Sequence, residues 1–381
     1  MLKKIQTYII NSFKIYKPLL YASLLLLTIG LIMFGSASLG VLERNEIKFY
    51  SIVKSQFVYA LLAGSIAMLI GLLINVKYYY KFAYIIFGFV VILNMFVFVP
   101  GMNRYHGGAH RWLDLLGFSL QPSEFLKISV VIFTSWFMIR YGTEIREKSY
   151  GLLYYIIFAL SISLILFLQK DTGTMLIVLL SSFVVYFAGG ANWRDILILC
   201  LLGVIGISII IHFRPYAMNR LVVFLHPETD LSGQGYQVRQ SLIAIGQGGW
   251  TGRGVGQGVQ KFSGYLPEPI SDSIFAVIGE EIGFLGSSFI IILYMYIITV
   301  GLYLSKQLNN SFNKLLAIGI SAMLGTQAYL NIGAIIGVLP LTGVPLPLVS
   351  HGGTSLLLFM FSLGILMNLS KFINKSRSMS I

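Results

Sequence analysis

The sequence predicts an all-α, polytopic membrane protein, a single domain over residues 1–381, with about ten transmembrane helices and one large loop outside the membrane. Two observations carry this prediction. Of the 381 residues, 56% are hydrophobic and only 11% are charged, whereas soluble domains have about 25% charged residues. Apolar runs also recur along the chain, and about 20 such residues suffice to cross a ~30 Å hydrocarbon layer as a helix. An ordinary soluble globule is therefore excluded.

Ten apolar runs divide the chain. They are expected as helices at about residues 19–39, 55–75, 82–100, 123–139, 151–168, 173–188, 195–212, 273–304, 314–338 and 350–370. The first run ends in small residues, Ser36-Ala37-Ser38, as a signal-peptidase site does. It is longer than the 7–15-residue apolar core of a signal peptide, so we expect it to be retained as a membrane helix.

The distribution of basic residues tests this topology. With ten spans and both termini in the cytoplasm, 15 of the 27 lysines and arginines fall on inner segments, and the short outer loops are poorer in them, as the positive-inside rule requires. The formal charge of +13 is thus explained by loop anchoring and by contacts with lipid phosphates, and no nucleic-acid partner is expected. The single cysteine, Cys200, excludes an intramolecular disulfide.

The segment 213–271 is the one large piece expected outside the membrane. It is rich in Gly, Gln and Ser, and glycine-rich backbone can approach a ligand closely. Neither a Walker A pattern nor a GxGxxG in a strand–helix context occurs there, so nucleotide binding is rejected. Its five cations suit phosphate groups, although interface anchoring is an alternative. They are Arg214, Arg220, Arg239, Arg253 and Lys261.

Charged residues also stand at the ends of inner runs. Glu124 and Lys127 lie on one face of the fourth run, either as a self-neutralising pair or with the lysine directed at an anionic ligand. Asp171 follows the fifth run, either as the cap of the next helix or as a functional acid. His106 and His110 have metal-pair spacing, but the two glycines between them disfavour the helix that such a pair needs, so no metal site is predicted.

The segment 337–356, "GVLPLTGVPLPLVSHGGTSL", carries three prolines and cannot be one helix. Irregular backbone at membrane depth is tolerated only where protein buries it or where it lines a cavity. We therefore expect a re-entrant wall here, with His351-Gly352-Gly353 opening the last span.

Residues 264–284, "GYLPEPISDSIFAVIGEEIGF", hold four of the 14 acidic residues. Two prolines stop any preceding helix, so Asp272 is expected at the start of one, either as its N-cap or as a reactive carboxylate at an aqueous mouth. Glu268 lies in the loop before it. Glu280 lies ~12 Å further along the helix and Glu281 faces the opposite side, so both are expected to be structural.

Taken together, the motifs "QPSE", "QKDTGT", "GYQVRQSLIAIGQGG", "LPEPISDSIFAVIGEEIGFLG" and "PLPLVSHGG" resemble the SEDS family, which comprises FtsW, RodA and SpoVE. The resemblance covers about residues 20–370, and residues 241–261 are more similar to the FtsW branch. It implies a peptidoglycan glycosyltransferase of the bacterial cytoplasmic membrane that polymerises lipid II on the outer face. A class B penicillin-binding protein that crosslinks the strands, and other division or elongation proteins, are the implied partners.

The resemblance also assigns residues. It places the essential aspartate of the family at Asp272, and the substrate-binding positions at Arg111, Trp112, Lys127, Asp171, Gln240, Ser241 and Glu268. The chain departs from the family pattern at four places: His351 replaces a tyrosine, Ser273 a phenylalanine and Lys170 a proline, and residues 106–110 read HGGAH. The roles of the 350–353 turn and of the 106–110 loop are left open by these departures.

The implied chemistry needs one base. The anomeric diphosphate of lipid II is already a good leaving group, so Asp272 need only take the proton of the acceptor hydroxyl, a role that typically contributes ~10²–10⁴-fold, in a displacement with inversion. Arg111, Lys127, Arg220 and Arg239 are the candidates to stabilise the departing diphosphate. A divalent cation could share that task, but no ligand cluster in the sequence announces one. A lipid II transporter and a scaffold for division proteins are the alternatives.

Overall fold

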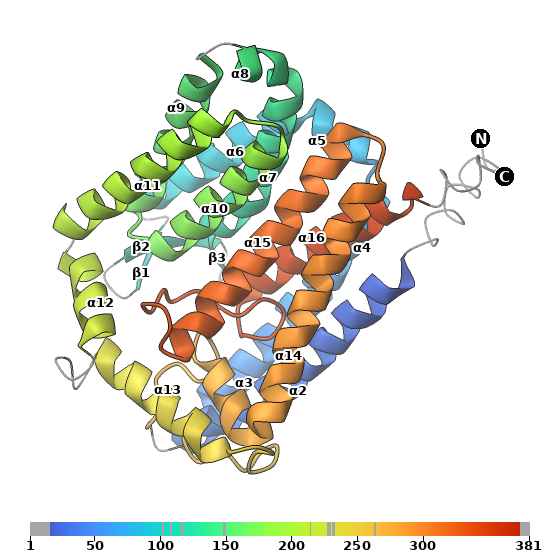
Figure 1. Ribbon diagram of the computed structural model, residues 1–381. Coiled ribbons are helices and arrows are strands. Elements are labelled where there is room, and N and C mark those ends of the chain that lie inside the picture. The colour runs from blue at the N-terminus through green and yellow to red at the C-terminus, as the bar shows by residue number, and fades with distance from the viewer. Residues whose placement is uncertain are drawn as a thin grey trace.

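The computed structural model describes residues 16–373, apart from short gaps at 101–102, 107–108, 116–117, 148–149, 214, 227–229, 231–232 and 263. Helices dominate the described chain (Figure 1). The long apolar helices are α2 (Lys17–Arg44), α7 (Pro122–Arg140), α9 (Tyr150–Leu168), α10 (Thr172–Ala188), α11 (Trp193–Phe213), α14 (Ile274–Gln307), α15 (Ser311–Ile335) and α16 (Gly353–Ser370). Two further apolar rods are composite. The first is α3 (Glu46–Lys54), the π-helix η1 (Ser55–Leu62) and α4 (Ala63–Leu73), and the second is α6 (Ala83–Met95) with η2 (Phe96–Phe98).

Each of the ten apolar runs in the sequence coincides with one of these rods. Within the described residues, eight are long and apolar enough to cross a membrane, and the rods at 83–98 and 172–188 are shorter. The prediction of an all-α, multi-pass membrane protein is thereby confirmed.

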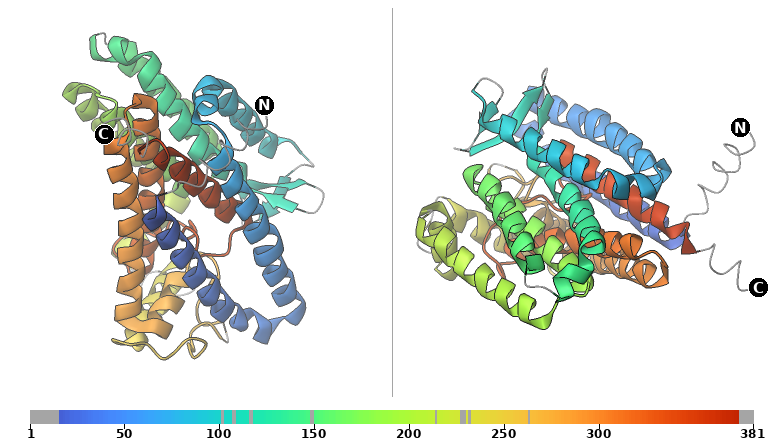
Figure 2. Two further views of the ribbon diagram at one scale, coloured as in Figure 1. Left: turned by 90° about the vertical axis from the view of Figure 1, so that its right-hand side faces the viewer. Right: turned by 90° about the horizontal axis from the view of Figure 1, so that it is seen from above.

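Three helices form the centre of the molecule, and one helix lies at its edge. Most of the apolar length of α7, α15 and α16 is buried in the protein, whereas only 6% of that of α11 is. Figure 2, seen from above, shows α16 (red) between α4 (blue) and α15 (orange), with α11 (yellow-green) at the periphery. The α4–α16 crossing is close because it uses glycine: a Cβ atom at Gly364 would lie 2.2 Å from the Met68 carbonyl oxygen, and small residues allow such approach between membrane helices.

The two ends of the described chain meet on one side of the molecule. The Tyr16 backbone N–H donates to Ser370 Oγ at 3.0 Å, which joins the start of α2 to the end of α16. Asn368, also near the end of α16, donates to the Gly71 carbonyl at 3.1 Å, and to that of Ile74. Because the first and the last of the long helices therefore begin and end on the same side, the chain crosses the membrane an even number of times.

The segment 213–271, predicted as one large loop outside the membrane, contains two helices. They are α12 (Pro215–Leu225) and α13 (Gln234–Gly248), and the described residues after α13 up to 271 form no helix or strand. Both helices lie at the end of the molecule opposite the short helices α5 (Val76–Lys81) and α8 (Gly142–Glu147) (Figure 1). We call the end of the molecule where α12 and α13 lie the α12–α13 end. Helical segments too short to cross a membrane have no long apolar run, which is why the sequence did not reveal them.

A small antiparallel sheet was likewise not expected. Its strands are β1 (Asn103–His106), β2 (Ala109–Leu115) and β3 (Phe118–Leu120), in the order β1-β2-β3. Arg104 pairs with Trp112, and Leu113 pairs with Leu120. His106 and His110 thus belong to a hairpin and not to a helix, which agrees with the argument against a metal pair on a helix.

The proline-rich segment after α15 is irregular, as predicted. Residues 336–352 contain no helix or strand, and Leu346, Leu348 and Val349 are all buried. Tyr294 donates its hydroxyl to the Pro347 carbonyl. Protein therefore surrounds residues 344–350 of this stretch, the condition under which irregular backbone is tolerated at membrane depth.

Candidate active site

The turn before α14 carries Asp272. Glu268 has a positive φ of 47°, and its carbonyl accepts the backbone N–H groups of Ser271 at 3.1 Å and Ser273 at 3.3 Å, which closes a tight turn. The helix begins at Ile274 with Ser273 as its N-cap, and no side chain caps it. The alternative interpretation of Asp272 as a helix cap is therefore wrong.

Neighbouring elements hold this turn by its backbone. Asn331 of α15 donates its side-chain amide to the Asp272 carbonyl at 2.9 Å and to the Val344 carbonyl at 2.8 Å. Ser350 Oγ donates to the Ser271 carbonyl at 2.5 Å, and the His351 N–H donates to the Ile270 carbonyl at 2.7 Å. The position of Asp272 is thus set by α15 and by the segment 344–351.

The Asp272 carboxyl group, in contrast, is left available. Its Oδ1 atom is buried and has no hydrogen-bond partner among the described residues. The pKa of Asp272 is raised from 3.8 to about 6, mainly by burial and also by the negative charge of Glu268. Hydrogen bonding from Gln237 and the positive charge of Arg220 act in the opposite direction. A carboxylate with this pKa is ionised at neutral pH and still accepts a proton readily, which suits a general base.

Arg220 of α12 is the cation beside this carboxyl group. Both side chains border Gly343: a Cβ atom built there would be 3.7 Å from Arg220 Nη2 and 3.9 Å from Asp272 Oδ2. Arg220 Nη1 lies 3.3 Å from the Thr342 carbonyl and 3.4 Å from Thr172 Oγ1. Gly343 has a φ of 67°, a conformation that favours glycine, and it lies close to both the base and the cation.

Lys127 takes part in a buried network. Its Nζ lies 2.7 Å from Glu124 Oε1 and donates to Gln327 Oε1 at 2.6 Å. Gln327 in turn donates to the Pro345 carbonyl at 2.8 Å. The pair Glu124–Lys127 matches the self-neutralising alternative of the sequence interpretation, and it links α7 to α15 and to the proline-rich segment.

Asp171 caps α10 and joins its own motif, "QKDTGT", to the motif "QPSE" that begins at Gln121. Its Oδ1 accepts the Thr174 N–H at 3.2 Å, and its Oδ2 accepts Ser123 Oγ at 2.9 Å and Gln121 Nε2 at 3.2 Å. Arg111 donates to the Lys170 carbonyl, so the hairpin β1–β2 is fastened to the same turn. Trp112 follows on β2 and is partly buried.

The remaining predicted residues lie on α13 and in the turn. Arg239 and Glu268 are exposed, and Gln240 is partly buried. Ser241 is fully buried and donates to the Gln237 carbonyl at 2.8 Å. Gln237 Nε2 also reaches Ser273 Oγ at 2.9 Å, next to Asp272. Arg214 lies outside the described residues.

Sequence reasoning missed two residues that shape this site, Gln237 and Asn331. A signal for Asn331 was present, because a buried amide inside an apolar run needs a partner, and both Gln327 and Asn331 interrupt the run at 314–338. Gln237 lies in a polar segment and carried no such signal.

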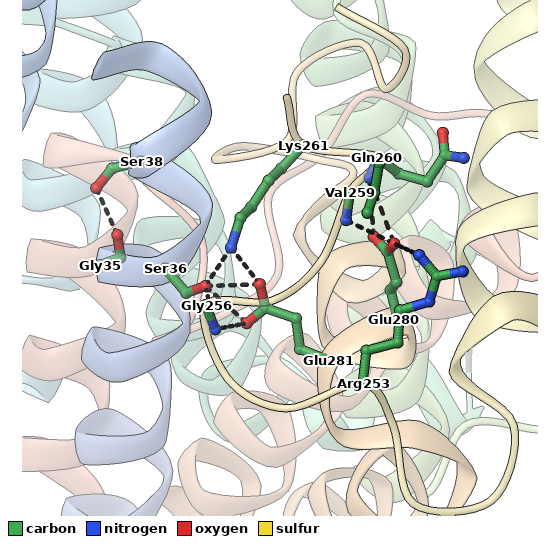
Figure 3. Close-up of polar contacts among 10 residues, drawn as sticks. All are labelled: Gly35, Ser36, Ser38, Arg253, Gly256, Val259, Gln260, Lys261, Glu280 and Glu281. Atoms are coloured by element: carbon green, nitrogen blue, oxygen red, sulfur yellow. Dashed lines mark hydrogen bonds and ion pairs between the residues drawn. The ribbon is translucent and has the colours of Figure 1, made fainter. Parts of the chain in front are cut away.

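Glu280 and Glu281 belong to a separate network (Figure 3). Glu280 Oε1 accepts the Val259 N–H at 2.7 Å, its Oε2 accepts the Gln260 N–H at 3.1 Å, and Arg253 Nη1 lies 3.4 Å from Oε1. The backbone path depends on Gly283 with a φ of 65°, because a Cβ atom there would lie 2.3 Å from the Gly252 nitrogen.

Glu281 fastens the loop that follows α13, which carries Gly256 and Lys261, to α2. The Lys261 ammonium forms an ion pair with it, Ser36 Oγ lies 2.6 Å from both carboxylate oxygens, and the Gly256 N–H donates to Oε2 at 3.1 Å. Both glutamates are fully buried. Arg253 and Lys261, expected among the phosphate-binding cations, are instead engaged in this network.

Within the described residues, no group of three or more His, Cys, Asp or Glu side chains is placed to hold a metal ion.

The family model for cell cycle proteins of the FtsW, RodA and SpoVE type matches residues 17–375. The chain belongs to this family. Stage V sporulation protein E of Bacillus subtilis is 34% identical over 359 residues, which cover 93% of this chain and 96% of that protein. The probable peptidoglycan glycosyltransferase FtsW of Geobacter sp. strain M18 is 32% identical over 351 residues, covering 92% and 95%.

Solved structures of similar proteins share the fold. One chain comes from a study of the structural coordination of polymerization and crosslinking by a peptidoglycan synthase complex. It superposes with a TM-score of 0.76 at 26% identity, covering 94% of this chain and 98% of that one. The rod shape-determining protein RodA of Thermus thermophilus gives a TM-score of 0.67 at 22% identity, covering 94% and 97%. The multi-pass architecture is thus that of the FtsW/RodA/SpoVE family.

Proposed function

We propose that this protein is a peptidoglycan glycosyltransferase that polymerises lipid II, with Asp272 as the general base. Relatives that are named probable peptidoglycan glycosyltransferases and match almost the whole chain support the reaction class. The observation that carries the assignment of the base is the Asp272 carboxyl group: its backbone is fixed from two sides, while its Oδ1 has no partner in the described part of the chain.

The reaction is a single displacement. Asp272 Oδ1 takes the proton of the acceptor sugar's hydroxyl while that oxygen forms a bond to the anomeric carbon of the donor. The bond from the anomeric carbon to the diphosphate breaks at the same time, its electron pair leaves with the diphosphate, and the anomeric configuration inverts. Because the diphosphate is a stable anion, no second carboxyl group has to protonate it, in contrast to glycoside hydrolysis.

Arg220 is the first candidate to stabilise the departing diphosphate, because it is the cation that shares the space around Gly343 with Asp272. A preorganised cation near developing negative charge is worth several kcal/mol to a transition state. Lys127 is neutralised by Glu124 and Arg111 is directed to the Lys170 carbonyl, so their roles in substrate binding are proposed through the segments they hold. Arg239, Gln240 and Glu268 are proposed to contact the sugar or peptide part of the substrate, and the buried Ser241 is proposed to act through α13, where it holds the Gln237 carbonyl. Trp112 and Asp171 are proposed to position the hairpin.

We further propose that the protein lies in a bacterial cytoplasmic membrane with the α12–α13 end on the outer face and both termini inside. The excess of lysine and arginine on the segments at the other end supports this orientation. A crosslinking enzyme, a class B penicillin-binding protein, is the proposed partner. A structure in which polymerization and crosslinking are coordinated in one complex supports it.

The test is polymerisation of purified lipid II by the full chain, supplied with its crosslinking partner. Glycan polymer is expected with the wild type and is expected to be lost with Asp272→Ala, while thermal unfolding shows that the variant is folded. Polymer formed by Asp272→Ala would overturn the assignment of the base. Movement of lipid II between the leaflets of vesicles without any polymer would show a transporter instead.

A further inference from the structure

His351 lies between the candidate active site and the first two membrane-spanning rods. Its backbone N–H donates to the carbonyl of Ile270 at 2.7 Å, two residues before Asp272. Its ring Nδ1 lies 2.9 Å from Gln56 Oε1. The ring also stacks on Phe34 of α2, with 5.6 Å between the centroids and 22° between the planes. One residue thus contacts the turn of the candidate base through its backbone, and α2 and the rod α3–η1–α4 through its side chain.

Gln56 is a buried amide inside an apolar rod. It is 1% exposed and lies in the π-helix η1, just after the end of α3. Short π-helical segments are frequent at functional sites, and a buried amide needs a hydrogen-bond partner. Gln56 Oε1 is an acceptor, so the ring of His351 donates to it in the tautomer that carries its proton on Nδ1. This hydrogen bond joins the ring to η1.

The segment that carries His351 is also packed directly against α2. A Cβ atom at Gly30 would lie 2.5 Å from the Leu348 carbonyl oxygen and 2.9 Å from Val349 Cα. Leu348 has a positive φ of 65°, which is a costly conformation for a bulky residue and persists only where the surrounding structure imposes it. Contacts with α2 therefore help to fix the path of this segment.

The chemistry of Asp272 requires such precision. A general base works only when its oxygen lies within hydrogen-bond reach of the proton that it removes, and a misplacement of about 1 Å can cost ~10²-fold in rate. The backbone of the turn is held on one side by Asn331 and on the other by residues 350–351. A weaker hold on His351 should therefore slow the chemical step more than it weakens substrate binding.

We propose that His351 is a positioning residue for the general base, and that its hydrogen bond to Gln56 makes it so. The inference rests on the proposed function, since it concerns the geometry of the same carboxylate. It assigns a role to the departure from the family's tyrosine: the imidazole offers a ring nitrogen to Gln56 and a flat face to Phe34. The first two membrane rods thereby take part in aligning the site.

The test separates the hydrogen bond from the ring. His351→Phe keeps the ring stack and loses the hydrogen bond, His351→Asn keeps a polar group near the Nδ1 position and loses the ring, and Gln56→Leu removes the partner. The full chain, supplied with its crosslinking partner, is assayed on lipid II. We expect kcat to fall about three- to tenfold in His351→Phe and Gln56→Leu, the usual worth of one hydrogen bond, with KM unchanged, and to be largely retained in His351→Asn.

The double variant Gln56→Leu/His351→Phe distinguishes positioning from stability. Each single variant leaves a polar group without its partner, whereas the double variant replaces both partners by apolar groups, which can be nearly neutral for stability. The Tm is therefore expected to return towards that of the wild type in the double variant, while kcat stays as low as in the single variants. Recovery of kcat together with the Tm would overturn the proposal, because the two residues would then act on stability alone.

Hydrogen exchange of backbone amides gives a readout that needs no catalysis. The N–H groups of Ser271 and Ser273, both bonded to the Glu268 carbonyl, report on the turn, and their exchange is expected to be faster in Gln56→Leu. Asn368→Leu is the matched control, because it removes a buried amide that ties α16 to the far end of the same rod. Exchange in the turn and kcat are expected to stay at wild-type values in this control.

Three outcomes would overturn the positioning role. They are wild-type kcat in Gln56→Leu and His351→Phe, an equal fall of kcat in the control, and a larger fall in His351→Asn than in His351→Phe. Failure of the proposed function is seen separately, as absence of polymer with the wild type or full activity in Asp272→Asn. Faster exchange in Gln56→Leu would in that case still show that His351 holds this turn.

Discussion

Two parts of one acidic stretch behave in opposite ways. Asp272 keeps a buried oxygen without a partner in the described structure, and its pKa is raised to about 6. Eight and nine residues further on, Glu280 and Glu281 are fully buried, and each is matched by a cation and by backbone N–H groups (Figure 3). The comparison teaches that burial alone does not make a carboxylate functional. The completeness of its hydrogen bonding separates a group that holds the chain from one that is free to react.

The two parts also depend on each other. Glu280 and Glu281 fasten the loop 249–263 to α14 and to α2, and that loop leads directly into the turn that carries Asp272. We therefore expect the paired glutamates to give the turn its rigidity, and Asp272 to provide the chemistry.

Asp272→Asn provides the largest contrast. Replacing the base by a neutral isostere is expected to lower the polymerisation rate by ~10²–10⁴-fold. Stability should not fall at pH 7. The folded pKa of Asp272 lies above its unfolded value, so the carboxyl group favours folding only at low pH, and that contribution is already lost once the pH has risen through about 6. Polymerisation rate and thermal unfolding at pH 7 check both expectations, and a large drop in Tm with full activity would reverse the comparison.

Glu281→Ala is the opposite case. It leaves the Lys261 ammonium buried without its carboxylate, and breaking a buried pair in this way costs ~3–5 kcal/mol. Urea or thermal unfolding in detergent measures the loss. The double variant Lys261→Met/Glu281→Leu removes both charges and is expected to recover most of the stability; equal instability of the single and double variants would show that the ion pair is not the cause.

Asn331 and Asn368 offer a matched pair. Each is buried and donates to two backbone carbonyls, Asn331 to those of Asp272 and Val344 and Asn368 to those of Gly71 and Ile74. Leucine at either position is expected to cost about 1–3 kcal/mol of stability per buried acceptor left unsatisfied. Only Asn331→Leu is expected to lower kcat as well, because only that residue positions Asp272. Equal activity of the two variants would refute a positioning role for Asn331.

The smallest effect is expected from Glu268→Gln. Polymerisation should fall as the pH drops below about 6, since the base must be ionised and the pKa of Asp272 is about 6. Removing the negative charge of Glu268 removes one cause of that raised pKa, so the acid limb of the pH–rate profile should move to lower pH by a fraction of a unit. A limb that stays in place, or moves upward, would show that Glu268 does not act on Asp272 through its charge.

The long apolar runs could be predicted because each is a local property: a helix that crosses a membrane needs about 20 apolar residues in succession. All ten were found in this way. The short helices α12 and α13 and the β1–β3 sheet could not be, because they depend on packing at the α12–α13 end and leave no long run in the sequence.

For the site, the sequence by itself determined which groups were available: a proline-bounded turn with Asp272, the cation Arg220, and prolines that forbid a helix after α15. Only the tertiary structure decided which of the charges are already engaged. Arg253 and Lys261 were expected among the phosphate-binding cations, yet each has a carboxylate partner on α14. Gln327, the partner of Lys127 on α15, lies 200 residues away in the sequence, Ser36, the partner of Lys261 on α2, lies 225 away, and Asn331, which holds the Asp272 carbonyl, lies 59 away. No local sequence pattern can report contacts over such separations.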